Sequence, residues 1–216
     1  MDFQILNIKD EIILVDNVIP VSLQNAVIQR VQGDNYFPWF LLHRIGHPDQ
    51  FGPGTNSNYA DPNITDDVGF FHMAFDGNNA STHYDFFRSI LEFFLEKTGI
   101  QITNLLRIRL RYTHKGKDHS LEKYAAPHVD FNSNKPYSTF VYYVDDSDGD
   151  TIIFDKIFNP DEETYNPVIA EPLKELARVT PKKGSGLYFN GHRYHAGNFP
   201  IEYSSRIVIN YDFEIL

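Results

Sequence analysis

The chain has 216 residues, which is enough for one domain with a substantial hydrophobic core. Its formal net charge of −10 argues against a nucleic-acid-binding surface, and its N-terminus lacks the basic and then apolar layout of a signal peptide. The absence of cysteine excludes disulfides, cysteine-based zinc sites and thiol catalysis, and no apolar run has the length of a membrane span. We therefore expect a soluble, cytoplasmic protein.

The first hundred residues combine strands, helices and one long irregular stretch. Apolar and aromatic segments predict strands at 3–8, 11–15, 37–42 and 68–75. Helical spacing of apolar residues predicts one helix over 21–31, with Ser22 as its N-cap, and a second over 82–98, which Gly99 ends. Residues 46–67 are rich in Gly, Pro, Asn and Asp, and such a stretch is typical of a binding loop or of a disordered segment.

After the second helix the pattern consists of strands. We predict them at 105–112, 138–144, 151–154, 168–169, 187–189 and 206–213. A mixed front with two helices, followed by strands, predicts a mainly β (α+β) fold in which the helices support one face of a jelly roll. No linker or repeat divides the chain, so we expect a single domain over 1–216, with 1–104 as support region and 105–216 as catalytic core.

The acidic segment 145–150 invites a calcium-binding interpretation. Aligning Gly149 with the glycine of an EF-hand loop places Asp155 where a glutamate is required, so the match fails. We instead expect a hairpin turn that joins the flanking strands, with Asp148-Gly149 supplying positive φ angles. Phosphate-loop, serine-hydrolase and zinc-protease motifs are also absent from the sequence.

The tripeptide His128-Val129-Asp130 carries two metal-binding side chains. On an extended chain both project from one face and could bind the same divalent ion, although a solvated His and Asp around a buried valine is the alternative for an isolated tripeptide. His195 follows a short strand, and Arg206 opens the next strand eleven residues later. Two His and one carboxylate form the facial triad suited to non-haem Fe(II), and a nearby guanidinium offers a fork for a carboxylate-bearing cosubstrate.

This ordered set of residues resembles the 2-oxoglutarate- and Fe(II)-dependent dioxygenases, in particular the prolyl-4-hydroxylase-like branch. The resemblance covers residues 105–213 and includes the strand 138–144 and the tripeptide 149–151. It implies a double-stranded β-helix, which is a jelly roll, and an enzyme that uses Fe(II), 2-oxoglutarate and O2 to hydroxylate an unactivated C–H bond. It leaves ascorbate open as a further cofactor.

The resemblance also implies a role for each matching residue. Fe(II) would be bound by His128, Asp130 and His195. Arg206 would pair with the distal carboxylate of 2-oxoglutarate, and Tyr143 is similar to a tyrosine that hydrogen-bonds the same carboxylate. Tyr112 is the best match to a family tyrosine on the strand before the metal motif, but the segment between Tyr112 and the first histidine is longer here.

Other histidines compete for these roles. His192 is the rival of His195 as distal ligand, although it lies farther from the arginine, and we favour a solvated position or one behind the ligands. His72 and His114 are expected to be ordinary core or surface histidines.

Strand alternation places further side chains. Arg107, Arg109 and Arg111 share one face of their strand, where they either cover acidic neighbours or line the substrate pocket. Tyr142 should point away from the pocket if Tyr143 points into it, because successive strand residues face opposite sides.

No motif names the substrate. The resemblance favours a prolyl or other residue of a protein or peptide, a small metabolite is the alternative, and the negative charge argues against DNA. A second hypothesis is a non-enzymic jelly-roll module that retains a metal site. The presence of Arg206 beside the three ligands argues against it, because such a module needs no cosubstrate.

Overall fold

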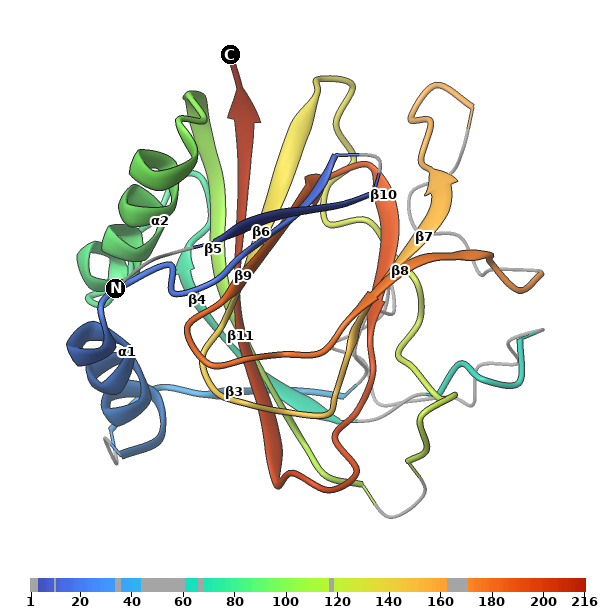
Figure 1. The fold of residues 1–216 in the computed structure, drawn as a ribbon, viewed down its shortest axis with the longest axis horizontal. Coiled ribbons are helices and arrows are strands. Elements are labelled where there is room, and N and C mark those ends of the chain that lie inside the picture. The colour runs from blue at the N-terminus through green and yellow to red at the C-terminus, as the bar shows by residue number, and fades with distance from the viewer. Residues whose placement is uncertain are drawn as a thin grey trace.

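The computed structural model describes residues 4–9, 11–33, 36–43, 61–65, 68–116, 119–162 and 171–216 (Figure 1). The N-terminal half contains β1 (Ile5–Lys9), β2 (Ile12–Val15), α1 (Val21–Ile28) with the π-helical turn Gln29–Gly33, β3 (Phe40–Leu42), β4 (Gly69–Phe75) and α2 (Tyr84–Thr98). The C-terminal half contains β5 (Ile102–His114), β6 (Tyr137–Tyr143), β7 (Thr151–Ile157), β8 (Glu175–Val179), β9 (Gly186–Asn190), β10 (Arg193–Gly197) and β11 (Ser205–Ile215). None of the helices in these ranges is long and apolar enough to cross a membrane.

The strands form two antiparallel sheets. The large sheet has the order β1-β2-β9-β6-β11-β5-β4-β3, and the small sheet has the order β10-β7-β8. Helices α1 and α2 lie together on the outer side of the large sheet, whereas the small sheet lies on its other side (Figure 1). This arrangement confirms the predicted mainly β jelly roll with two supporting helices.

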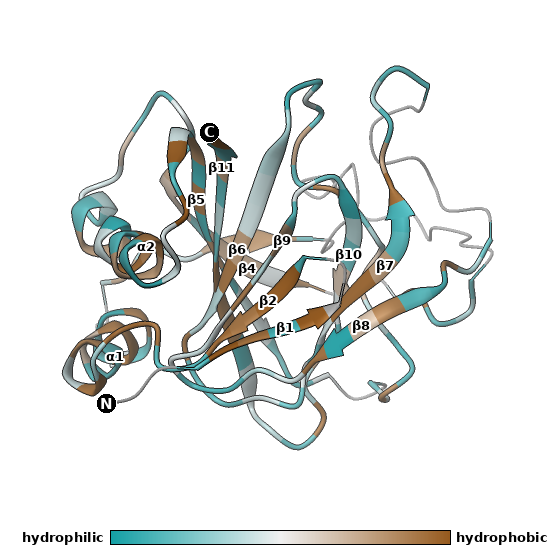
Figure 2. Ribbon diagram, turned by 45° about the horizontal axis from the view of Figure 1, so that its top comes forward, coloured by the Kyte–Doolittle hydropathy of each residue, from teal (hydrophilic) through white to brown (hydrophobic). Residues whose placement is uncertain are grey.

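Alternation along the central strands separates two hydrophobic cores. Ile207 and Ile209 of β11 belong to the core under the helices, whereas Val208 between them belongs to the core between the sheets. In β6, Tyr142 faces the helices and Tyr143 faces the second sheet, as predicted. Figure 2 shows the resulting mixture of hydrophobic and hydrophilic colours along β5 and β11. The inner face of the large sheet also carries polar side chains, and Arg206 and Asn210 line a cavity there together with Val208.

Aromatic stacking holds helix α2 against the outer face. The ring of Phe94 lies nearly parallel to that of Phe140, with centroids 3.9 Å apart, and Phe140 stacks in turn on Tyr211 at 5.4 Å. The hydroxyl of Tyr211 donates a 2.9 Å hydrogen bond to the carbonyl of Phe87 in the helix. Gly99 ends the helix in a left-handed conformation with φ of 72°, as predicted.

The connection between β6 and β7 differs from the predicted hairpin. These two strands belong to different sheets, so residues 144–150 cross from the large sheet to the small one. The side chain of Asp148 accepts hydrogen bonds from the amides of Ile201 and Glu202, which ties this crossing to the segment before β11. Gly149 does not adopt a positive φ angle. The acidic composition indicated a turn but could not identify which strands the segment connects.

Other differences concern boundaries. The carbonyl of Pro20 accepts the first hydrogen bonds of α1, from Leu23 and Gln24, so Pro20 occupies the N-cap position predicted for Ser22. The structure also contains strands β8 and β10. The sequence pattern did not predict them, because each is only five residues long. The predicted strand at 168–169 and most of the irregular stretch 46–67 lie outside the described residues.

Candidate metal centre and cosubstrate pocket

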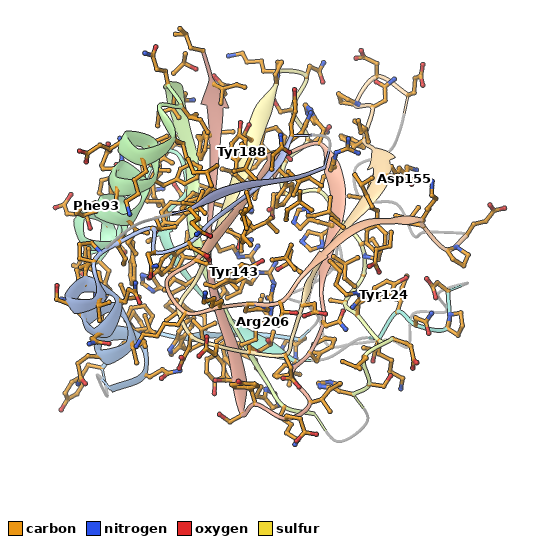
Figure 3. The ribbon with its side chains drawn as sticks, viewed as in Figure 1. Phe93, Tyr124, Tyr143, Asp155, Tyr188 and Arg206 are labelled. Atoms are coloured by element: carbon orange, nitrogen blue, oxygen red, sulfur yellow. The ribbon has the colours of Figure 1, made fainter. Side chains whose placement is uncertain are left out.

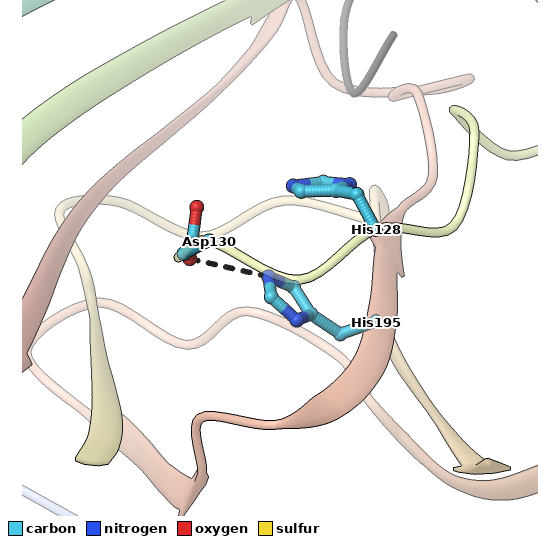
Figure 4. A group of neighbouring side chains, drawn as sticks. All are labelled: His128, Asp130 and His195. Atoms are coloured by element: carbon cyan, nitrogen blue, oxygen red, sulfur yellow. Dashed lines mark ion pairs between the residues drawn. The ribbon is translucent and has the colours of Figure 1, made fainter. Parts of the chain in front are cut away.

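Three side chains of metal-binding type converge between the sheets. His128 and Asp130 lie on the segment that leads from β5 to β6, and His195 lies on β10. The backbones of the two histidines exchange hydrogen bonds of 3.0 Å in both directions, which places their rings 4.7 Å apart. Each of the three residues offers one ligand atom, and these atoms all lie within 4.8 Å of one another. Nε2 of His195 points toward Asp130, at 3.4 Å from Oδ2 (Figure 4).

The orientation of both imidazoles suits metal binding. Nδ1 of His128 lies 2.9 Å from the carbonyl of Ala126, and Nδ1 of His195 lies 3.2 Å from the carbonyl of Arg193. A hydrogen on Nδ1 leaves the lone pair on Nε2, which is the atom that a metal would bind. Nε2 of His195 is buried and makes no hydrogen bond with any part of the chain that the structure describes. Two imidazole nitrogens and one carboxylate oxygen fit Fe(II) by ligand chemistry.

Electrostatics keep His128 and Asp130 in the forms that bind a metal. Burial and the neighbouring charge of His195 lower the pKa of His128 to about 3, so its imidazole is neutral at pH 7. Burial by itself would raise the pKa of Asp130, but the attraction of Arg107 and of His195 outweighs it and holds this pKa well below its usual range. Asp130 is therefore a carboxylate at neutral pH, and both states are those that bind a cation.

Arg206 lies at the start of β11 and lines the same cavity as His128 and His195. It is 7% exposed, and its guanidinium is fixed from two directions. Nε donates a 2.6 Å hydrogen bond to the carbonyl of Gly149, and Nη2 donates a 2.8 Å hydrogen bond to Oγ1 of Thr151. Burial lowers the pKa of Arg206, yet a guanidinium stays charged in proteins. The cavity thus combines a candidate metal centre with a buried cation suited to a carboxylate.

Two glycines make room for this guanidinium. A Cβ atom at Gly149 would lie 2.8 Å from Cδ of Arg206 and 2.9 Å from the carbonyl oxygen of Asn198. A Cβ atom at Gly197 would lie 3.2 Å from Nη1 of the same arginine. Gly149 was expected to serve a turn, whereas the structure shows that its missing side chain provides space beside Arg206.

Tyr143 lies next to Arg206 through a shared partner. Its hydroxyl donates a 2.9 Å hydrogen bond to Oγ1 of Thr151, the same oxygen that accepts from Arg206. Both side chains lie in the region between the two sheets (Figure 3). Burial raises the pKa of Tyr143 to about 12, so the phenol is protonated at neutral pH. The structure therefore places Tyr143 one hydrogen bond behind the guanidinium, with Thr151 as the link.

Tyr112 lies away from the cavity. It pairs with Ile207 of β11, and its ring contacts Trp39 and Phe70 at centroid distances of 5.7 and 5.9 Å. Its neighbours Arg111 and Thr113 line the cavity instead. The expectation that Tyr112 binds the cosubstrate is corrected by strand alternation, which places it on the outer face of β5.

The rival histidines have other partners. Nε2 of His192 lies 2.8 Å from the carbonyl of Ser133, and its ring packs against Tyr137, so it lies apart from the metal-binding group. His72 is buried between Pro38 and Ser81, which its two ring nitrogens contact at 3.0 and 3.1 Å. It is a core histidine, as predicted.

Arg107 and Arg111 each fit a different interpretation of their strand face. Arg107 forms ion pairs with Asp130 and Asp212, whereas Arg111 lines the cavity. Sequence reasoning missed Asp212 and Thr151, although a polar residue at an inward position of an alternating strand was a usable signal for Asp212.

Comparison with known proteins found matches among solved structures and none among family models or curated sequences. The fold is similar to that of the non-heme alpha-ketoglutarate-dependent epimerase SnoN from nogalamycin biosynthesis, with 14% identity, a TM-score of 0.59, and coverage of 95% of this chain and 76% of that one. It is also similar to a 2OG-Fe(II) oxygenase family oxidoreductase from Burkholderia pseudomallei, with 12% identity, a TM-score of 0.56, and coverage of 94% and 84%.

A third match is a prolyl hydroxylase from Trichoplax adhaerens in complex with a peptide of the hypoxia-inducible factor oxygen degradation domain. The identity is 13%, the TM-score is 0.54, and the match covers 94% of this chain and 83% of that one. Identities this low establish the fold alone. The chain therefore has the double-stranded β-helix fold found in 2-oxoglutarate- and Fe(II)-dependent oxygenases, as the family resemblance of its candidate metal-binding residues predicted.

Proposed function

We propose that this protein is an Fe(II)- and 2-oxoglutarate-dependent oxygenase whose metal is bound by His128, Asp130 and His195. The observation that carries the proposal is the shared cavity, whose lining includes His128, His195 and the buried cation of Arg206. A metal-binding module without catalysis has no use for a buried guanidinium in that place, because burying it costs free energy.

The proposed reaction uses one O2 for each 2-oxoglutarate. Fe(II), when bound, would supply the oxidative chemistry in which one oxygen atom enters succinate, with release of CO2, and the other enters a C–H bond of the substrate as a hydroxyl group. Arg206, fixed by Gly149 and Thr151, would bind the distal carboxylate of 2-oxoglutarate. The hydrophobic residues between the sheets would exclude water from this cavity.

For the substrate, we propose a prolyl or other residue of a protein or peptide. The similarity in fold to a prolyl hydroxylase that holds a peptide supports this choice. The reaction outcome is a separate part of the proposal, because the similar structures also include an epimerase.

A small acidic metabolite is the second candidate, and Arg111 favours it. This arginine lines the same cavity as His128 and is 7% exposed, so the lining contains a second cation besides Arg206. A carboxylate or phosphate on the substrate would pair with it. Succinate formation measured with proline-containing peptides and with small carboxylic acids separates the two candidates.

The metal site is tested by substitution at each candidate ligand. We expect Asp130→Ala and His195→Ala to abolish Fe(II)-dependent formation of succinate from 2-oxoglutarate, because each removes one of three ligands. His192→Ala is the matched control, since its ring contacts Ser133 and Tyr137 instead, and it should retain activity. Wild-type succinate production by Asp130→Ala or His195→Ala would show that the assignment is wrong.

A spectroscopic experiment separates an enzyme from a bare metal-binding module. Fe(II) and then 2-oxoglutarate are added to the wild-type protein without oxygen. We expect a visible charge-transfer band only when both are present. A module that binds iron but not the cosubstrate would give no such band.

A further inference from the structure

A chain of buried polar groups lies behind Asp130 on the inner face of the large sheet. Oγ1 of Thr139 donates a 2.8 Å hydrogen bond to Oδ1 of Asp212, and Nε of Arg107 donates a 2.9 Å hydrogen bond to Oδ2 of the same carboxylate. Nη2 of Arg107 also lies 2.8 Å from Oδ2 of Asp212 and forms an ion pair with Oδ1 of Asp130. One guanidinium therefore contacts two carboxylates.

Strand register explains why these groups meet. Asp212 of β11 is paired with Arg107 of β5 on one side and with Thr139 of β6 on the other. Cross-strand partners point to the same side of a sheet, so all three side chains point inward. Asp130 approaches from the segment before β6, and the next residue, Phe131, covers the guanidinium, with its ring centroid 4.8 Å from Cζ.

The charged groups of Arg107, Asp130 and Asp212 are buried, and burying a charge costs free energy. The side chain of Arg107 is 10% exposed, that of Asp130 is 2% exposed and that of Asp212 is fully buried. Charges at such depth destabilise a fold unless each is paired and hydrogen-bonded. A single carboxylate would neutralise Arg107, so the second carboxylate needs another reason, and that second carboxylate is the candidate metal ligand.

The two carboxylate oxygens of Asp130 have different partners. Oδ1 is engaged by Arg107, whereas Oδ2 lies 3.4 Å from Nε2 of His195. Asp212 prevents the guanidinium from rotating, because it fixes Nε and Nη2 together. The carboxylate of Asp130 is thereby held with Oδ2 directed toward His195.

We propose that Arg107, held in place by Asp212, is a positioning residue that fixes the orientation of Asp130 for metal binding. The inference rests on the proposed function only in requiring that His128, Asp130 and His195 bind a metal. Such residues behind a ligand typically contribute about 10- to 100-fold to metal affinity.

The test measures Co(II) affinity of the purified metal-free protein by visible absorption, which needs neither 2-oxoglutarate nor substrate. We expect Arg107→Met to weaken Co(II) binding by about 10- to 100-fold, because Asp130 loses its fixed orientation. We also expect the shape of the Co(II) spectrum to change, because a released carboxylate can offer both oxygens. Arg107→Lys keeps the charge without the fork and should recover only part of the affinity.

Arg109→Met is the matched control. Arg109 lies two residues away on the same face, and its guanidinium packs over the ring of Phe71, with Cζ 5.1 Å from the centroid. Its loss removes a neighbouring charge that also acts on Asp130, while the ion pair between Arg107 and Asp130 stays in place, so the Co(II) spectrum should stay that of the wild type. Equal effects of Arg109→Met and Arg107→Met would overturn the positioning role in favour of a general charge effect.

Arg107→Met leaves the carboxylates of Asp130 and Asp212 buried near each other, and this variant could fail to fold. A second variant therefore keeps the inference testable. The double variant Arg107→Met/Asp212→Asn removes one of these charges and should fold more readily, while showing the same loss of Co(II) affinity. Wild-type affinity in either folded variant would overturn the inference. A wild-type protein that failed to bind Co(II) would instead overturn the metal site itself, and the inference with it.

Discussion

Arg206 donates a 2.8 Å hydrogen bond to Oγ1 of Thr151 from within the cavity that both residues line. The same oxygen accepts a hydrogen bond from Tyr143, at 2.9 Å. A fixed guanidinium with a second layer of hydrogen bonds behind it loses little side-chain freedom when an anion binds. This relationship gives separate expectations for the arginine and for the tyrosine.

Replacing Arg206 should weaken 2-oxoglutarate binding. We expect Arg206→Gln to cost about 1.5–3 kcal/mol, or roughly 10- to 100-fold in affinity, because a buried charge-assisted pair is lost. The measurement is the dependence of succinate formation on 2-oxoglutarate concentration. Arg88→Gln, which removes a helix-surface arginine paired with Glu92, is the control and should change nothing. An unchanged dependence in Arg206→Gln would disprove the role.

Tyr143→Phe should have a smaller effect on the same quantity. The substitution removes one hydrogen bond to Thr151, worth about 0.5–1.5 kcal/mol, while the arginine stays in place. Tyr142→Phe is a closely matched control, because the Tyr142 hydroxyl is buried on the helix side and makes no hydrogen bond within the described part of the chain. Equal 2-oxoglutarate affinity in the two variants would contradict a role for Tyr143.

Gly149→Ala should disturb Arg206 without changing any polar group. The new methyl group would lie 2.8 Å from Cδ of the arginine and 2.9 Å from a backbone oxygen, so the guanidinium must shift. Overpacking of this kind costs about 1–3 kcal/mol of stability. We expect weaker 2-oxoglutarate binding together with a lower melting temperature. A variant with wild-type values of both would show that the site has more space than the structure indicates.

His72 should make stability depend on pH. Burial lowers its pKa from 6.5, with a smaller contribution from the neighbouring His83, so the native protein prefers the neutral imidazole. The unfolded chain then binds more protons, and stability falls as the pH drops below about 6.5, by no more than about 1.4 kcal/mol per pH unit for one proton. Urea unfolding of the wild type and of His72→Gln between about pH 5 and pH 8 measures this contribution. Parallel profiles for the two proteins would contradict it.

Phe94→Ala should destabilise the whole fold. The ring is fully buried and stacks on Phe140 at 3.9 Å, so its removal leaves a cavity between helix and sheet. Such a substitution typically costs about 3–5 kcal/mol. Chemical unfolding measures the loss, and Glu96→Ala, at an exposed position of the same helix, is the control. A cost below about 1 kcal/mol would mean that the helix does not depend on this stack.

The sequence by itself predicted the features that depend on local periodicity. Alternation in 206–213 and in 105–112 gave the strands and separated their two faces, and the spacing of apolar residues gave both helices. The order of His128, Asp130, His195 and Arg206 indicated the fold and the candidate metal-binding group through its resemblance to a known family of jelly-roll enzymes.

Only the tertiary structure decided which faces and segments meet. Tyr112 and the arginines beside it alternate in the sequence, but the packing of two sheets determines which of them face the cavity. Segment 144–150 contains turn residues whether it joins neighbouring strands or crosses between sheets. The pairing of Arg107 with Asp212 spans 105 residues and follows from strand register, which depends on long-range packing that local sequence patterns do not encode.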